Sequence, residues 1–274
     1  MEILPLDIKA NLSKAEQLLK QAAKGQKLDL VVFPEDFITG PIPYNLEYAL
    51  DENSEAISFL RNLARQYNTY IVPGSFINHK GGKYYNTAVL IDNKGKIILE
   101  YDKNNLWLPE RTYLTPGTAL PVVKTSIGTI GLAVCWDLAY PEVFQALAGQ
   151  GADIICLPSY WTREDGGPLT RKYPNIQSEV NMVDALCPAR AIETNALVIY
   201  ANGAKKGEVY LKTKKIALNQ IGHSQICAPL EGVVKKMPNN DEGFISYTYD
   251  KKIGRDAESR YLLRRDIFPR ALSG

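Results

Sequence analysis

The stretch Thr129-Ile-Gly-Leu-Ala-Val-Cys135-Trp-Asp-Leu-Ala-Tyr-Pro141-Glu142 carries the clearest structural signal of this sequence. Its first seven residues are mostly small or branched and uncharged, which predicts a buried strand that ends on Cys135. Pro141 suits the first turn of a helix, and Glu142 lies where the helix dipole favours a negative charge. The thiol of Cys135 is therefore expected at the exit of a strand, just before a helix.

The following segment, Gly151–Pro158, predicts a second buried strand. Strand, turn, helix and strand then follow one another, as in α/β proteins. Ligands of α/β proteins gather beyond the carboxyl ends of the strands. The predicted place of Cys135 is thus suited to chemistry.

The remaining elements are predicted from apolar periodicity and from turn residues. Capping-box spacing of Ser13 and Glu16 places a helix there, and Gly25 closes it. The same arrangement occurs twice: helix, strand and an acidic or nucleophilic residue at the strand's end are found around Glu35 and again around Cys135. We therefore expect two mixed sheets that stack as a four-layer α-β-β-α sandwich. Further strands are expected at 28–33, 70–77, 84–91, 96–101, 196–202, 224–228, 232–236 and 243–249, further helices at 51–67, 178–195 and 250–263, a solvated hairpin or flap at 205–215, and an extended tail at 264–270.

Length and composition favour one domain that spans residues 1–274, since 45% of the residues are apolar and can bury a large core. Lys and Arg number 32 against 30 Asp and Glu, so no charge surplus indicates nucleic acid or an anionic membrane as a partner. No apolar run approaches the length of a membrane span. A soluble, cytoplasmic protein is the expectation.

The cysteines give no sign of a metal site or of a disulfide framework. Cys135, Cys156, Cys187 and Cys227 are widely spaced, and a chain of this size does not need disulfides, so reduced thiols are expected. With two histidines in the chain, no Cys/His zinc cluster can be drawn. We expect no metal, although residue counting leaves a carboxylate-only site open.

Three further side chains are candidates for chemistry. Glu35 ends a predicted strand, and Lys103 and Glu110 lie in a loop of low periodicity. Each also has an ordinary interpretation: a solvated turn for Glu35, an exposed lysine for Lys103, and a surface ion pair with Arg111 for Glu110.

Taken together, these residues resemble the nitrilase superfamily of carbon-nitrogen hydrolases. The resemblance covers nearly the whole chain, and the motifs that carry it follow in the order of that family. They are Val-Val-Phe-Pro-Glu35, Tyr-Asp-Lys103, Glu110 before Pro116-Gly117, Cys135-Trp-Asp, Pro141-Glu142, Arg190-Ala-Ile-Glu-Thr-Asn195, Gly222-His-Ser224 and the Arg-Arg pair near the C-terminus.

The resemblance implies a catalytic triad of Glu35, Lys103 and Cys135, with Glu110 as an additional glutamate that anchors the lysine. Cys135 would attack an amide or nitrile carbon, Glu35 would accept the thiol proton, and Lys103 would favour the thiolate and stabilise the developing oxyanion. The backbone N–H of Trp136 would be the second donor to that oxyanion. No cofactor is implied.

Three aromatic residues are candidates for substrate binding: Trp136 and Trp161, which follow successive strands, and Tyr44 in the loop after Glu35. Trp is also a common core residue. The resemblance implies hydrolysis of a small amide, with nitrile or N-carbamoyl hydrolysis, acyl transfer or a scaffold with a vestigial site as alternatives. It also implies a homodimer or higher homo-oligomer, with contacts from the helix after Cys135 and the C-terminal tail.

The sequence departs from the family pattern in three places. Members of the family begin with an apolar strand, whereas Met1–Asp7 leaves at most a stub of one. Asn105 stands where many members have His after the lysine, and the stretch Thr162–Leu186 is longer than in compact amidases. These differences predict an individually shaped pocket mouth.

Overall fold

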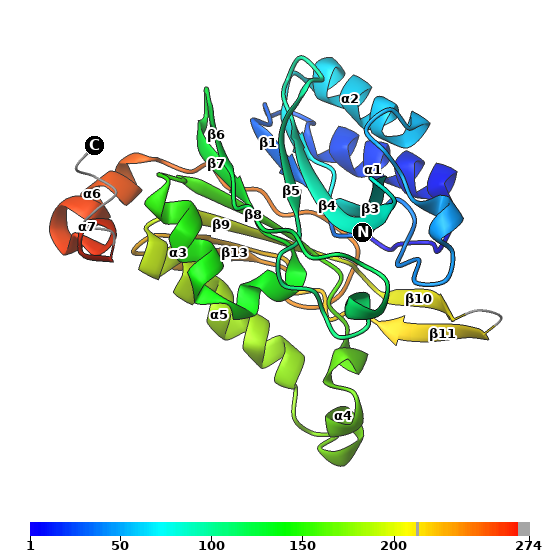
Figure 1. Cartoon of the computed structure of the whole chain (residues 1–274). Coiled ribbons are helices and arrows are strands. Elements are labelled where there is room, and N and C mark those ends of the chain that lie inside the picture. Colours follow the sequence, from blue (N-terminus) through cyan, green and yellow to red (C-terminus); the bar gives the residue numbers. More distant parts are fainter. Residues whose placement is uncertain (212–213, 268–274) are drawn as a thin grey trace.

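Two β-sheets face each other in the computed structural model, and helices cover their outer faces (Figure 1). The structure describes residues 1–211 and 214–267. Helices α1 (Ile8–Ala22) and α2 (Glu55–Tyr67) cover one sheet, and α3 (Pro141–Gly149) and α5 (Ser178–Thr194) cover the other. The predicted α-β-β-α sandwich is confirmed.

The first sheet is mixed, because one parallel pair joins an antiparallel meander. Its strand order is β1-β2-β4-β3, with β5 paired to β4. The predicted strand 70–77 is broken at Gly74, whose φ is +67°. A Cβ at Gly74 would lie 1.8 Å from the carbonyl oxygen of Pro34, so only glycine fits beside the Glu35 turn. The strands are β1 (Leu30–Val32), β2 (Tyr70–Val72), β3 (Ser75–Lys80), β4 (Lys83–Ile91) and β5 (Ile97–Asp102).

The second sheet is also mixed and has the order β13-β12-β9-β8-β7-β6. Strands β7, β8 and β9 are parallel, which follows from the helical connections between them. A separate antiparallel hairpin of β10 (Lys206–Leu211) and β11 (Lys214–Asn219) agrees with the predicted hairpin at 205–215. The strands of the sheet are β6 (Val122–Thr125), β7 (Gly128–Leu132), β8 (Ile154–Ser159), β9 (Leu197–Asn202), β12 (Gln225–Ala228) and β13 (Gly232–Lys236).

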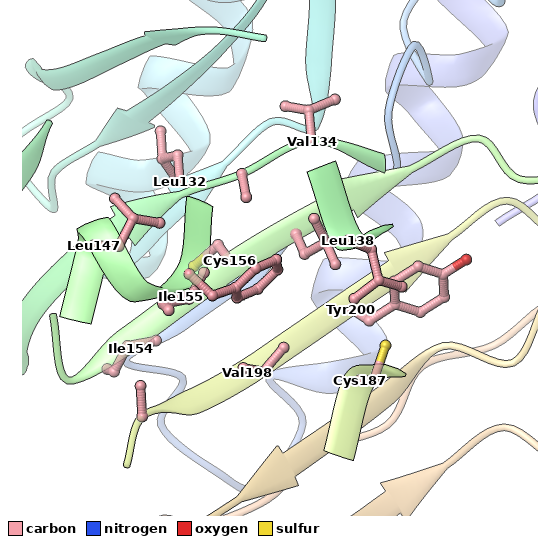
Figure 2. Close-up of a cluster of buried hydrophobic side chains, with 14 of the residues drawn as sticks. Leu132, Val134, Leu138, Leu147, Ile154, Ile155, Cys156, Cys187, Val198 and Tyr200 are labelled. Atoms are coloured by element: carbon pink, nitrogen blue, oxygen red, sulfur yellow. The ribbon is translucent and has the colours of Figure 1, made fainter. Parts of the chain in front are cut away.

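The main core lies on both faces of the central strands of this second sheet. Every residue of β8 is buried, as its continuous apolar sequence predicts. Figure 2 shows Cys156 on β8 and Cys187 on α5 within this cluster, close to Val198 and Tyr200. Like the other cysteines, both are free and buried, which supports their interpretation as small core residues.

Two predicted boundaries at the ends of the chain are wrong. Helix α1 begins at Ile8, because the side chain of Asp7 accepts the backbone N–H of Ala10 at 3.0 Å and caps the helix. Ser13 therefore lies inside the helix. Near the other end, Arg264 lies in α7 (Leu263–Ile267) rather than in an extended tail, while residues 268–270 of that predicted tail lie outside the described residues.

The predicted strand 243–249 is not a strand, although its side chains alternate as in one. Ile245, Tyr247 and Tyr249 pack against the core, and the residues between them are exposed. Among the described residues, none forms a backbone hydrogen bond with this segment. The segment has the apolar alternation of a strand, but pairing requires a neighbouring strand, and none of the described strands pairs with it.

The shorter helical elements connect these strands and helices. Helix α6 (Lys252–Tyr261) lies within the helix predicted at 250–263. In the part of the chain that the structure describes, no helix has the length and apolar character needed to span a membrane. The other short elements are η1 (Leu46–Tyr48), η2 (Glu110–Thr112), η3 (Cys135–Ala139), η4 (Arg163–Gly166) and α4 (Pro168–Lys172).

Candidate active site

Cys135 begins the sharp turn between β7 and α3. Strand β7 ends at Leu132, three residues earlier than predicted, and Cys135 opens η3 with a φ of +47°. This left-handed conformation is uncommon for a residue with a side chain. The turn directs the chain sharply away from the strand, and it leaves the Cys135 side chain 9% exposed.

Asp137 ties this turn to the segment that carries Lys103. Its fully buried carboxylate accepts the N–H of Val134 at 2.8 Å and the hydroxyl of Tyr101 at 2.7 Å. The backbone and side-chain amides of Asn105 donate to it at 3.1 and 2.9 Å. Sequence reasoning missed this role, although a charge directly after a buried strand is a signal that could have found it.

Lys103 is buried between two carboxylates. Its side chain is 1% exposed, and Nζ lies 3.0 Å from Oε1 of Glu35 and 2.8 Å from Oε2 of Glu110. The interpretation of Lys103 as an exposed lysine is therefore wrong. So is the surface pair of Glu110 with Arg111, because Arg111 donates to the carbonyl of Leu106 instead.

Asn86 on β4 joins the two glutamates. Its Nδ2 donates to Oε1 of Glu35 at 2.8 Å and to Oε1 of Glu110 at 2.7 Å. The backbone N–H of Tyr160 donates to the other oxygen of Glu35 at 2.8 Å. Sequence reasoning missed Asn86, and the signal was an amide in the middle of a buried strand, where Asn is uncommon.

The charges of Glu35, Lys103 and Glu110 act on the thiol of Cys135. Burial would lower the pKa of Lys103, but the carboxylates of Glu110 and Glu35 raise it well above its usual value, so the side chain is an ammonium. Burial and the charge of Glu35 raise the pKa of the Cys135 thiol, against the opposing effect of Lys103. Glu35 and Lys103 are the charges that act most strongly on the thiol, which requires proximity. The raised pKa favours the neutral thiol, from which Glu35 would have to accept a proton.

Two of the three candidate aromatic residues pack against each other: Trp136, which follows Cys135 in the chain, and Trp161. The ring of Trp136 is 5.7 Å from that of Trp161 and 4.5 Å from that of Trp107. Trp161 is 2% exposed, and its indole N–H donates to Glu179 at 2.7 Å. Tyr44, by contrast, is 53% exposed.

A cavity of about 580 Å³ lies elsewhere, between the sheets beside β1 and α1. Its lining is formed largely by β1, β9 and the extended segment 243–249, and it does not include Glu35, Lys103 or Cys135. Its walls are mainly aliphatic and aromatic side chains, with some serines and lysines, and they include none of the predicted site residues. Within residues 1–211 and 214–267, no group of three or more His, Cys, Asp or Glu residues could hold a metal ion.

Comparison with known proteins identifies the family. The family model for carbon-nitrogen hydrolases matches residues 1–257. The chain belongs to the carbon-nitrogen hydrolase family. This hydrolase is 28% identical to a probable nitrilase of Schizosaccharomyces pombe, over 97% of the chain and 94% of the relative. It is 28% identical to a deaminated glutathione amidase of Dictyostelium discoideum, over 88% of the chain and 83% of the relative.

The crystal structure of Saccharomyces cerevisiae Nit3, a member of branch 10 of the nitrilase superfamily, matches with a TM-score of 0.72 at 26% identity. The match covers 88% of this hydrolase and 84% of Nit3. These similarities agree with the sequence interpretation, and the protein is an amidase-like carbon-nitrogen hydrolase.

Proposed function

We propose that this hydrolase cleaves the carbon-nitrogen bond of a small amide through a thioester on Cys135. The observation that supports this most directly is the buried ammonium of Lys103, bonded to Glu35 and Glu110 while both Lys103 and Glu35 act on the Cys135 thiol. A base, a cation and a nucleophile in one buried cluster are the groups that acyl transfer needs.

Glu35 acts as the general base in this proposal. It takes the thiol proton as the Cys135 sulfur attacks the amide carbon, and the carbonyl π electrons move onto oxygen. When the tetrahedral intermediate collapses, the carbon-nitrogen bond breaks and Glu35 gives the proton to the departing ammonia or amine. Glu35 then takes a proton from water as the water oxygen attacks the thioester carbon. When this second tetrahedral intermediate collapses, the carbon-sulfur bond breaks, Glu35 returns the proton to the sulfur, and the carboxylic acid leaves.

Lys103 and the backbone N–H of Trp136 stabilise the oxyanion in both halves of the cycle. Removal of one such donor typically costs about 2.7–4 kcal/mol of transition-state stabilisation. Lys103 suits this role because its pKa is raised well above the usual value, so it remains charged throughout. Glu110 holds the ammonium in place through its 2.8 Å ion pair, and it does not take part in proton transfer.

Two further parts of the proposal concern the substrate walls and the assembly. Trp136 and Trp161 form a wall beside the reacting carbon, with Tyr44 farther out. We also propose a homodimer or higher oligomer, with contacts from α3 and the C-terminal tail that begins at Arg264. Light scattering of the protein as it elutes from a size-exclusion column measures its mass, and a monomer mass would contradict the proposed oligomer.

The central experiment is a mass spectrum of protein quenched during turnover of amides, nitriles and N-carbamoyl compounds. An acyl mass on Cys135 with release of ammonia from amides is the expected result. Nitrile turnover alone would assign nitrile hydrolysis instead, in line with the name of the Schizosaccharomyces pombe relative. If no compound adds mass, and Cys135→Ala behaves as the unaltered protein, amide hydrolysis through Cys135 is contradicted.

A further inference from the structure

Arg190 on α5 is a buried arginine that contacts the turn of the proposed nucleophile. Its side chain is 7% exposed. Nε and Nη2 of its guanidinium both donate to the carbonyl oxygen of Leu138, at 3.1 and 3.0 Å, and Leu138 belongs to η3, which begins at Cys135. Two bonds from one rigid, planar group restrict where that oxygen can lie.

The carbonyl of Leu138 depends on this donor. It lies in the last turn of η3, where carbonyls have no N–H of their own helix to bond to. Among the described residues, no backbone N–H donates to it, and Leu138 is fully buried. Without Arg190, the turn would contain a buried acceptor that lacks a donor, which is unfavourable.

The guanidinium is itself held by contacts outside the turn. Nη1 bonds to Glu193 at 3.0 Å, and the guanidinium carbon lies 5.5 Å from the centre of the Phe144 ring on α3. Helix α5 packs along both α3 and η3. All three nitrogens of the guanidinium are therefore engaged, and α5 and α3 fix its place beside the turn.

The Cys135 turn is thus anchored on both sides of the nucleophile. Before Cys135, the carboxylate of Asp137 binds the N–H of Val134, and after it Arg190 binds the carbonyl of Leu138. Cys135 has a φ of +47°, a strained conformation that persists only when the surrounding structure holds it. The backbone N–H of Trp136, the proposed second oxyanion donor, lies between the two anchors.

We propose that Arg190 is a positioning residue, which keeps the Cys135 thiol and the Trp136 backbone N–H aligned by holding the carbonyl of Leu138. Arg190 touches neither the substrate nor the reacting atoms. This inference rests on the amide hydrolysis proposed above, and it adds a residue from α5, a helix that carries none of the proposed catalytic groups.

Arg190→Met tests the role in turnover, because methionine fills part of the space but has no donor. It should lower kcat about tenfold or more and leave KM within about twofold, since alignment rather than substrate binding is lost. Arg190→Lys keeps the charge but not the planar fork, and it should recover part of the lost kcat. Thermal melting shows whether each variant is folded.

An unchanged kcat in folded Arg190→Met, or an effect on KM alone, overturns the inference. If Arg190→Met does not fold, Arg190→Lys decides: a kcat about threefold or more below that of the unaltered protein is expected, and an unchanged kcat overturns the inference.

Two control variants separate this role from general effects of losing an arginine. Arg61 on α2 also donates to a backbone carbonyl, that of Gly95 at 2.7 Å, but away from the site. Glu193→Gln removes the charge that pairs with Arg190 and leaves both bonds to Leu138. Arg61→Met and Glu193→Gln should each keep the kcat of the unaltered protein. An equal fall of kcat in Arg61→Met and Arg190→Met overturns the inference.

Two measurements without substrate separate this inference from the proposed hydrolysis. In Arg190→Met, or in Arg190→Lys if the former does not fold, hydrogen exchange of residues 133–140 should accelerate about tenfold, while that of β8 stays unchanged. The Cys135 thiol, now 9% exposed, should react with a small thiosulfonate about threefold faster or more, because a loosened turn admits the reagent. Unchanged exchange and an unchanged thiol rate overturn the inference. If the unaltered protein hydrolyses no amide, the proposed hydrolysis is contradicted, but these measurements still decide whether Arg190 holds the turn.

Discussion

The hydroxyl of Tyr101 donates a 2.7 Å hydrogen bond to Asp137 and thereby joins the strand before Lys103 to the turn that carries Cys135. Asn105 donates to the same carboxylate from the far side of Lys103. Tyr101 and Asn105, which lie on either side of Lys103 in the sequence, thus both bond to the buried carboxylate of Asp137. The proposed cation and nucleophile are positioned relative to each other by a carboxylate that touches neither.

Asp137→Asn should therefore impair both stability and turnover. The amide nitrogen of asparagine would face either the N–H of Val134 and the hydroxyl of Tyr101, or the two amide groups of Asn105, and the free energy of unfolding should fall by about 1–3 kcal/mol. We expect kcat to fall about tenfold or more, because the nucleophile and the cation lose their alignment. Urea denaturation and steady-state kinetics measure the two effects.

A matched control for this variant is Asp92→Asn. Asp92 also accepts two backbone N–H groups, those of Lys94 and Lys96, but in a turn remote from the site. This control should leave kcat unchanged. An Asp137→Asn protein with the kcat of the unaltered chain would contradict the proposed positioning role.

Removal of the charge at Lys103 should destabilise the fold strongly. In Lys103→Met, two buried carboxylates face each other without their cation, and breaking a buried pair in this way costs about 3–5 kcal/mol. Lys80→Met is the comparison, since Lys80 also binds two carboxylates, those of Glu100 and Asp102, but is 31% exposed. It should cost about 1 kcal/mol or less. If chemical denaturation showed the same loss of unfolding free energy in Lys103→Met and Lys80→Met, burial of Lys103 would not explain its contribution to stability.

Gly74→Ala should disturb the Glu35 turn. The new Cβ would overlap the carbonyl oxygen of Pro34, and the positive φ adds backbone strain. The strain alone should lower the free energy of unfolding by about 1–2 kcal/mol, so we expect Gly74→Ala to lower it by well above about 2 kcal/mol. Gly81→Ala isolates the strain, because Gly81 has a φ of +56° and nothing within 4 Å of its Cβ position. Similar melting temperatures for the two variants would refute the steric argument.

The raised pKa of Cys135 predicts an unusual pH profile for modification. Since burial and Glu35 hold the thiol in its neutral form, its reaction with a small thiosulfonate should keep accelerating above pH 9. An exposed cysteine would level off near its ordinary pKa of about 8.5. Peptide mapping by mass spectrometry separates Cys135 from the other cysteines. A plateau below pH 8 would indicate a preformed thiolate instead.

Stability should change with pH through Asp165. Burial raises its pKa from 3.8 to about 7, so the folded state binds more protons than the unfolded state between these values. The stabilisation is present below the unfolded pKa and is lost as pH rises through 7. From pH 5 to pH 8, Asp165→Asn should gain about 1–2 kcal/mol relative to the unaltered protein, a reduced figure because the carboxyl is partly exposed. A constant difference in urea denaturation would contradict this.

The sequence was sufficient where local patterns decide the structure. The small, uncharged run before Cys135 and the Pro141-Glu142 start of the next helix predicted a strand, a turn and a helix, and the structure has β7, η3 and α3 there. The fully buried β8 could likewise be predicted, because all its residues before Ser159 are apolar, without alternation. These features depend on neighbours in sequence.

Features that depend on distant partners were missed. Asn86 reads as an interruption of β4 until folding brings Glu35 and Glu110 to either side of it. Conversely, 243–249 has the alternation of a strand but no pairing neighbour. A catalytic role for Glu35, Lys103, Glu110 and Cys135, a binding role for Tyr44, the single domain and a cytoplasmic location stay predictions.

The backbone at Cys135 has the left-handed conformation that glycine tolerates best. Any other residue there reduces the net stability of the native state by about 1–2 kcal/mol. The Cys135 thiol therefore stands on a strained turn, and the packing around that turn must offset the strain.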